Sequence, residues 1–144
     1  MVFKDEYDFL SNFYLSPFTV NELEYKTVEH FFQSYKPLDI YEREIIRKCK
    51  DPQTAKKLGR TYTLRPEWKR IKYSVMMTGV INKFKNPELK EKLFSIPKNV
   101  EIIEHNYWHD NFWGYCVCPK CADKEHLNNL GKILMLIKNG NILS

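Results

Sequence analysis

The sequence predicts a mainly α-helical, compact single-domain fold with a short β-hairpin near the N-terminus. Apolar residues recur with the 3.6-residue period of a helix over most of the chain, and only one short pair of segments has clear strand character. The 144 residues are 43% apolar and 15% aromatic, which is enough to fill one hydrophobic core. No internal repeat or low-complexity segment divides them, so we expect one domain over residues 1–144.

The expected hairpin consists of residues 18–20 and 23–25, which flank the polar pair Asn21-Glu22. This pair is compatible with a tight turn, but it lacks the Asn-Gly signature that would define the turn type. The sequence therefore leaves the turn type open.

The first helix is expected to begin after Thr27, whose hydroxyl can cap its N-terminus. Its apolar residues follow the spacing i, i+3, i+4, i+7 and are Val28, Phe31, Phe32 and Tyr35. Pro37 should end this helix, because the residue before a proline avoids helical geometry.

Periodicity, capping residues and prolines predict further helices over residues 39–48, 51–59, 66–84, 87–94 and about 128–140. In the helix over 39–48, Tyr41, Ile45 and Ile46 should face the core. The helix that begins at Asp51-Pro52 should end at Gly59, and the last helix should close at Gly140. Residues 100–103 could form a brief strand, whereas residues 105–126 show no period.

The charge balance permits a phosphate-bearing partner, including nucleic acid, without requiring one. Lys and Arg number 23 against 18 acidic residues, a net charge of +5, but the two signs alternate along most of the chain. No stretch approaches the roughly 20 apolar residues of a membrane span, and charges at residues 4–6 stand where a signal peptide would be apolar. We therefore expect a cytoplasmic protein without membrane contact.

A polar stripe on the first helix is the first candidate site. Glu29, Gln33 and Lys36 follow i, i+4, i+7 and so share one helical face, along which a sugar ring could lie. A solvated polar face is the simpler interpretation of the same spacing, because most surface helices have one. The pattern alone favours that simpler interpretation.

Aromatic rings and a helix N-terminus offer two further candidate sites. Trp68 lies beside Arg65 and Lys69, and Trp113 lies in an aperiodic loop next to Gly114, so either ring could stack on a base or simply pack. The segment Asn128 to Gly131 opens the last helix, where free N–H groups attract anions. Close helix packing explains a first-turn glycine equally simply.

A cysteine loop is the fourth candidate. Cys116, Cys118 and Cys121, followed by His126, supply three thiols and an imidazole, and the last two cysteines have the C-x-x-C spacing of a zinc knuckle. Because no second C-x-x-C pair exists, we expect reduced thiols and no metal, with zinc as the alternative.

Six blocks of the sequence, read in order, resemble the NADAR family, also called the YbiA-like family. The blocks are Phe9 to Phe13, Val28 to Gln33 with Lys36, Leu58-Gly59-Arg60, Trp68, Asp110 to Gly114, and Asn128 to Met135. Together they span nearly the whole chain, and their order is far more specific than any single motif.

The resemblance implies a mainly helical fold whose members cleave N-glycosidic bonds. Their substrates are phosphorylated intermediates of riboflavin synthesis, or ADP-ribose linked to a guanine base. The resemblance implies that Glu29 and Asp110 are catalytic carboxylates and Lys36 a catalytic amine. It implies substrate binding by Asn12, Arg60, Trp68, Trp113, Gly114, Asn128 and Gly131. The riboflavin branch usually has Asp-Gly after the Trp-Gly pair, whereas Tyr115 and Cys116 follow here.

These residue types suit glycosidic cleavage, which needs a proton for the leaving base and stabilisation of positive charge at the anomeric carbon. A carboxylate can serve either need, and a lysine of lowered pKa could form a Schiff base with an opened ribose. We therefore expect an N-glycosidase that needs no cofactor, with ADP-ribose or phosphoribose, free or attached to nucleic acid, as its partner. The alternatives are a non-catalytic sensor of NAD or ADP-ribose and a nucleic-acid-binding protein that uses the positive charge.

Overall fold

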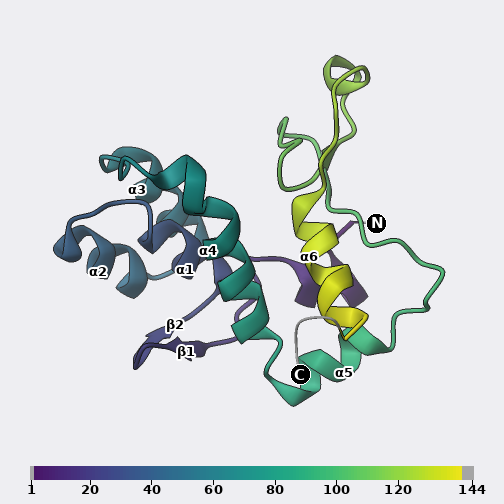
Figure 1. The fold of residues 1–144 in the computed structure, drawn as a ribbon, viewed down its shortest axis with the longest axis horizontal. Coiled ribbons are helices and arrows are strands. Elements are labelled where there is room, and N and C mark those ends of the chain that lie inside the picture. The colour runs from purple at the N-terminus through teal and green to yellow at the C-terminus, as the bar shows by residue number, and fades with distance from the viewer. Residues whose placement is uncertain (1, 141–144) are drawn as a thin grey trace. The chain divides into compact units, whose positions relative to one another are not determined.

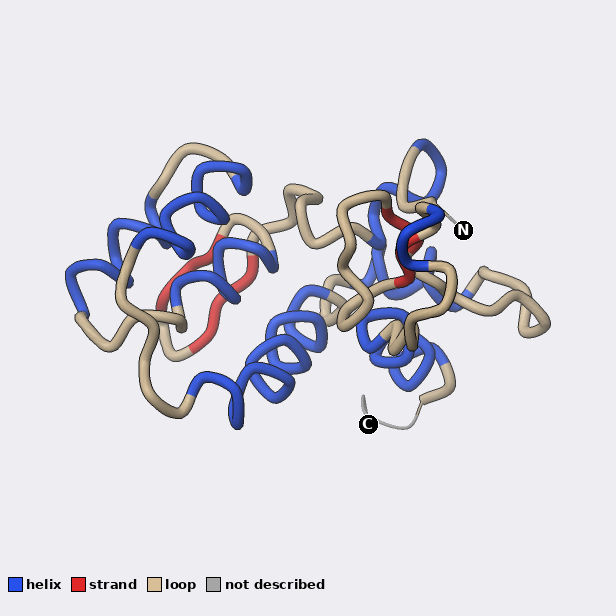
Figure 2. The backbone as a smooth tube through the Cα atoms, turned by 90° about the horizontal axis from the view of Figure 1, so that it is seen from above, coloured by secondary structure: helices blue, strands red, loops and turns tan. Residues whose placement is uncertain are grey.

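The computed structural model describes residues 2–140, and the chain folds into two compact units. One unit comprises residues 12–86. The other combines the N-terminal segment up to Ser11 with the chain from Pro87 onwards. Helices form most of the regular structure, as Figure 2 shows, so the mainly α prediction is confirmed in outline. The single domain expected from the sequence stays a prediction.

The unit of residues 12–86 begins with a hairpin of two strands, β1 (Phe18–Val20) and β2 (Leu23–Tyr25), and continues with four helices (Figure 1). These helices are α1 (Val28–Ser34), α2 (Ile40–Lys48), α3 (Pro52–Thr61) and α4 (Trp68–Lys83). Helix α1 contacts each of α2, α3 and α4. It is therefore the central element of this unit.

The hairpin prediction is confirmed. The strands pair antiparallel with Phe18 opposite Tyr25, and both rings pack with the Phe31 ring on α1. Asn21 and Glu22 adopt φ values of 51° and 67°. Two successive left-handed residues are typical of a type I′ turn, whose twist matches that of the strands. The structure thus decides the turn type.

Helix α1 begins where the sequence predicts, but it is shorter than expected. The Thr27 side chain accepts a hydrogen bond from the His30 backbone N–H, as its capping role requires. The helix ends at Ser34, and Tyr35 is its C-cap. Lys36 therefore lies in the turn after the helix.

Two expectations for α2 are wrong. Tyr41 is 77% exposed and Ile45 is 50% exposed, whereas Ile46 is fully buried. Tyr41 and Ile45 are four residues apart and share a face, and Ile46 lies 100° further around the helix. This short helix buries only the narrow stripe that contains Ile46.

The predicted end of α3 is also wrong. Asp51 caps its N-terminus through a hydrogen bond from Thr54 N–H, as expected, but the helix continues through Gly59 to Thr61. Gly59 is therefore a buried position inside the helix and not a C-terminal glycine. Its role is a close approach to α1, described below.

In its described residues, 2–11 and 87–140, the second unit contains two 3₁₀ helices, two α-helices and two short strands. They are η1 (Asp5–Leu10), α5 (Pro87–Phe94), β3 (His105–Asn106), β4 (Tyr115–Cys116), η2 (Pro119–Cys121) and α6 (Asn129–Lys138). Helices α5 and α6 occur as predicted, and Gly140 follows α6 with a φ of 75°. The strand expected at 100–103 is wrong, because the pairing lies further along, where His105 and Asn106 pair parallel with Tyr115 and Cys116. Within residues 2–140, no helix is long and apolar enough to span a membrane.

Candidate active site

Glu29 and Gln33 on α1 are buried, so the solvated-face interpretation of the polar stripe is wrong. Their exposed fractions are 7% and 3%. The Gln33 amide nitrogen donates to Glu29 Oε1 at 3.3 Å, and the Glu29 backbone N–H donates to the Asn12 carbonyl at 3.1 Å. A buried carboxylate held by neighbouring groups is what a catalytic acid requires.

Gly59 on α3 makes room for the Gln33 side chain. A Cβ atom at residue 59 would overlap the side-chain carbonyl oxygen of Gln33. That oxygen is buried, and it accepts no hydrogen bond from the part of the chain that the structure describes. The Gly-Arg motif therefore has a physical reason: glycine lets α3 approach α1 closely enough to fix Gln33 beside Glu29.

Substituting Gly59→Ala should destabilise the protein by about 1–3 kcal/mol, because the added methyl group overpacks the contact with Gln33. An alanine in an ordinary helix interior would instead stabilise it by roughly 0.5–1 kcal/mol, so the sign of the change is informative. Urea denaturation measures it. In the Gly59→Ala, Gln33→Ala double variant, most of the lost stability should return, because the clashing carbonyl is gone. A stabilising effect of Gly59→Ala alone would contradict the packing described here.

Lys36 lies half-buried in the turn after α1, with its Nζ 5.6 Å from the centroid of the Phe32 ring. Burial lowers the pKa of Lys36, the Glu29 carboxylate acts to raise it, and the charge of Arg60 lowers it further. Lys56 and Lys72 lower it in the same way. Lys36 is thus an amine with an increased neutral fraction, electrostatically coupled to Glu29.

Arg65 holds the turn that carries Lys36, a role that the sequence did not indicate. Its backbone N–H donates to the Lys36 carbonyl at 2.7 Å, and its Nη2 donates to the Pro37 carbonyl at 3.2 Å. Its Nη1 also pairs with Glu67 at 3.3 Å. The Arg65 guanidinium is therefore engaged with the protein itself.

His30 is a second residue whose role comes only from the structure. It is fully buried, and its ring nitrogens lie 2.8 Å from Thr27 Oγ1 and 3.1 Å from the Cys49 carbonyl oxygen. Burial lowers the pKa of His30, although the hydrogen bond to Cys49 acts in the opposite direction. His30 therefore ties α1 to the segment between α2 and α3.

Three predicted binding residues also lie in this unit. The backbone carbonyl of Asn12 accepts a hydrogen bond from the Glu29 N–H, and the side-chain amide of Asn12 donates to Met76 Sδ at 3.4 Å. Arg60 is exposed in the last turn of α3, and its charge acts on Lys36. Trp68 is 6% exposed and packs edge-on against the Phe32 ring, with centroids 5.0 Å apart. Packing accounts for the burial of Trp68, and its role in binding stays a prediction.

The second predicted carboxylate, Asp110, belongs to the other unit and organises its own loop. Its Oδ1 accepts the backbone N–H groups of Phe112 at 3.1 Å and Trp113 at 2.9 Å. The side chain of Asn106 is buried and forms two hydrogen bonds with the Asp110 backbone. Asn106 Nδ2 donates to the Asp110 carbonyl at 2.8 Å, and the Asp110 N–H donates to Asn106 Oδ1 at 3.2 Å. These contacts give Asp110 a structural role, and a catalytic one stays a prediction.

The start of α6 differs from the anion site that the sequence suggested. The N–H groups of Asn129 and Leu130 donate to the carbonyls of Phe112 and Trp113, so they are not free for an anion. A Cβ on Gly131 would overlap the Ile102 carbonyl, so this glycine serves close packing. The helix N-terminus therefore gives no support for anion binding here, and the substrate binding by Asn128 and Gly131 that the resemblance implies stays a prediction.

Trp113, Gly114 and Asn128 lie together in the same unit. The Trp113 ring is half-buried and edge-on to Phe112 at 4.7 Å, and a Cβ on Gly114 would overlap the Glu104 backbone carbonyl. The Asn128 side chain accepts from Glu104 N–H at 3.0 Å and donates to the Ile102 carbonyl at 2.9 Å. Direct contact of these residues with substrate stays a prediction.

Comparison with known proteins assigns the whole described chain to one family. The family model of the NADAR domain matches residues 2–140, which includes both units. The chain belongs to the NADAR family.

Relatives of this NADAR chain have names that refer to glycosidase activity. It is 32% identical to the N-glycosidase YbiA of Escherichia coli (strain K12) over 139 residues, which cover 93% of this chain and 81% of YbiA. It is also 32% identical to the N-glycosidase Npun_R5314 of Nostoc punctiforme, over 96% of this chain and 89% of that protein. The NMR structure of E. coli YbiA matches with a TM-score of 0.79 and 29% identity, over 97% of this chain and 83% of that one.

In this NADAR chain, the two residues after Trp113-Gly114 serve other purposes than acid chemistry. The Tyr115 ring stacks on the His126 ring, with centroids 3.7 Å apart and an interplanar angle of 17°. Cys116 is 1% exposed on β4. Neither residue supplies a carboxylate, so no acid role falls on these two positions, and the acid roles of Glu29 and Asp110 stay predictions.

Proposed function

We propose that this protein is an N-glycosidase that hydrolyses the bond between a base and a phosphorylated ribose, with Glu29 and Lys36 as its reacting groups. One observation supports this most strongly: a buried carboxylate is electrostatically coupled to a lysine whose pKa burial lowers. The names of the curated relatives support the same class of reaction.

Glu29 supplies the acid–base chemistry. The leaving base needs a proton as its bond to the anomeric carbon breaks, and the sugar gains positive charge at that carbon. In its protonated form Glu29 delivers the proton, and in its ionised form it stabilises the charge. Gln33 holds the carboxylate in place through its amide nitrogen.

Lys36 offers a covalent route. Its neutral amine attacks the anomeric carbon, the bond from that carbon to the base breaks, and the base leaves with a proton from Glu29. Opening of the ribose ring then gives a Schiff base. One water molecule hydrolyses it, which frees Lys36 and the phosphorylated sugar. The lowered pKa of Lys36 favours this route because only the neutral amine attacks.

The positive charges near Lys36 support a phosphate-bearing substrate. Lys56, Arg60 and Lys72 all act on Lys36 electrostatically. Phosphate oxygens form charge-assisted hydrogen bonds with such groups.

Two classes of substrate carry both a phosphate and an N-glycosidic bond to a base. They are ADP-ribose linked to guanine, free or in DNA, and the aminopyrimidine ribose phosphates of riboflavin synthesis. The riboflavin biosynthesis protein VVA0006 of Vibrio vulnificus, 31% identical over 93% of this chain and 35% of that protein, supports the second class.

The test is to incubate the purified protein with ADP-ribosylated guanine DNA and, separately, with aminopyrimidine ribose phosphates. Liquid chromatography with mass spectrometry should detect free base from one class and not from the other. A Glu29→Gln, Lys36→Ala double variant, purified in parallel, controls for contaminating hydrolases. No base release from either class would exclude the enzymatic function, and tight ADP-ribose binding without turnover would then identify a sensor.

A further inference from the structure

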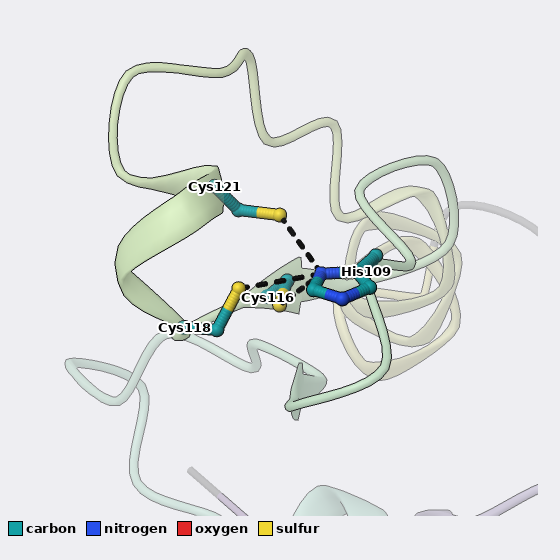
Figure 3. A group of neighbouring side chains, drawn as sticks. All are labelled: His109, Cys116, Cys118 and Cys121. Carbon is teal, nitrogen blue, oxygen red and sulfur yellow. Dashed lines mark hydrogen bonds between the residues drawn. The ribbon is translucent and has the colours of Figure 1, made fainter.

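Three cysteines and one histidine converge in the unit that contains residues 87–140. Figure 3 shows the side chains of His109, Cys116, Cys118 and Cys121 pointing toward one another from separate parts of the loop region. Their donor atoms all lie within 4.8 Å of one another. Cys116 comes from β4, and His109 comes from the loop after β3. Cys118 directly precedes η2, and Cys121 is the last residue of η2.

The distances fit one central cation. His109 Nδ1 lies 3.3 Å from Cys118 Sγ, 3.4 Å from Cys121 Sγ and 3.8 Å from Cys116 Sγ. A tetrahedral zinc ion with Zn–S bonds of about 2.3 Å and a Zn–N bond of about 2.0–2.1 Å places nitrogen and sulfur about 3.6 Å apart. The three observed distances bracket that value.

Hydrogen bonding does not explain the convergence. A neutral imidazole Nδ1 either donates one proton or accepts one, so it cannot satisfy three sulfur atoms at once. A disulfide between two of the thiols would leave the third thiol and the imidazole without a reason to meet there. A cation with four ligands accounts for all four side chains.

We propose that His109, Cys116, Cys118 and Cys121 bind one structural zinc ion. Three thiolates and one imidazole nitrogen are a common ligand set for zinc, and four protein ligands leave no open position for a substrate. The sequence favoured a metal-free loop because it showed no second C-x-x-C pair, and it offered the wrong histidine. His126 instead stacks on Tyr115 and lies 2.6 Å from Asn111 Oδ1 through its Nδ1.

The backbone holds His109 in position for this role. His109 has a φ of 66°, a left-handed conformation that non-glycine residues rarely adopt. The flanking residues Trp108 and Asp110 both donate their backbone N–H groups to Asn106 Oδ1. These hydrogen bonds place His109 at the tip of a turn that faces the cysteines. Zinc would then fix both ends of the segment from His109 to Cys121, which includes Asp110, Trp113 and Gly114.

Metal analysis of protein purified without chelator tests the proposal, with Zn²⁺ as the probe. We expect one zinc per chain by elemental analysis, and a stoichiometric loss in the Cys118→Ser, Cys121→Ser and His109→Asn variants. Asparagine at 109 tolerates the left-handed backbone, so this variant removes the ligand without adding strain. Cys49→Ser and His126→Asn are the matched controls and should retain the full zinc content, because neither residue belongs to the cluster.

A second measurement needs only the wild-type chain, so variants that fail to fold cannot obscure the result. Metal-free protein titrated with Co²⁺ under reducing conditions should give the visible bands of tetrahedral coordination together with thiolate charge-transfer absorption, saturating at one equivalent. Bound zinc should also slow the alkylation of Cys116, Cys118 and Cys121 relative to the metal-free protein, whereas the alkylation rate of Cys49 should be the same with and without zinc. Wild-type protein that binds neither metal would overturn the proposal, and so would ligand variants with undiminished zinc. Neither result depends on the glycosidase reaction, because Glu29 and Lys36 lie in the other unit.

Discussion

Replacing Lys36 by alanine is expected to reduce base release to the background rate, a loss on the order of 10³-fold or more if the Schiff base is obligatory. The reason is that the variant removes the amine whose pKa burial lowers. The measurement is turnover of whichever substrate class the wild-type protein cleaves. Lys50→Ala is the matched control, because Lys50 is exposed in the same unit, and its turnover should equal that of the wild type.

Borohydride trapping separates the covalent route from simple hydrolysis. Reduction during turnover should link the sugar irreversibly to Lys36 alone, detectable as a mass increase on the peptide that contains this residue. Near-normal turnover of Lys36→Ala would eliminate the covalent route and return the chemistry to the carboxylates.

The pH dependence of trapping should follow the charges around Lys36. Only the neutral amine attacks, so the trapping yield should rise with pH. The midpoint of that rise should lie below the ordinary lysine pKa of 10.5, because the pKa of Lys36 is lowered. The Glu29 carboxylate raises the pKa of Lys36, so Glu29→Gln should move the midpoint to lower pH. Arg60 lowers that pKa, so Arg60→Ala should move the midpoint to higher pH. Shifts of the same sign in both variants would contradict this electrostatic arrangement.

Replacing Glu29 by glutamine should lower turnover by a factor on the order of 10² or more while substrate affinity changes little. Glutamine preserves the size and much of the hydrogen bonding of the side chain, including contact with the Gln33 amide, but it cannot transfer a proton. Single-turnover rates measure the chemical step, and calorimetry on the inactive variant measures affinity.

Glu24→Gln is the control for this charge change, because Glu24 is exposed on β2 of the same unit. Its turnover should match that of the wild type. If Glu29→Gln were fully active, the burial of Glu29 would reflect the packing of α1, and the acid would have to be another residue.

The sequence alone predicted the elements whose signals are local. Thr27 caps α1, Asp51 caps α3, and the hairpin flanks Asn21-Glu22, because capping and turn geometry depend on a few neighbouring residues. It failed on α2, where burial depends on which helical stripe meets a packing partner. The exposure of Tyr41 and Ile45 follows from which stripe of α2 meets its neighbours, which periodicity by itself does not define.

For the candidate site, the sequence placed Glu29, Gln33 and Lys36 on one side of a helix, and the family resemblance selected Glu29 and Lys36 as functional. Spacing could not show that Glu29 and Gln33 are buried, because burial depends on the packing of α3. The sequence predicted that Gly59 ends α3, because glycine is common just after the end of a helix. Its actual role is a contact with Gln33, which lies 26 positions away in the sequence and which no local pattern indicates.

The same reason explains the fourth ligand of the proposed zinc site. From its position in the sequence, His126 was the nearest histidine after the cysteines, and His109 lies in a segment without periodicity. Only the folded chain brings His109 Nδ1 to within 3.3–3.8 Å of the three sulfur atoms. Local sequence thus predicted the helices and the hairpin of this protein, and the family resemblance selected its candidate reacting groups. The tertiary structure decided which of those groups are buried and which distant side chains meet, because both depend on contacts between segments that are far apart in the chain.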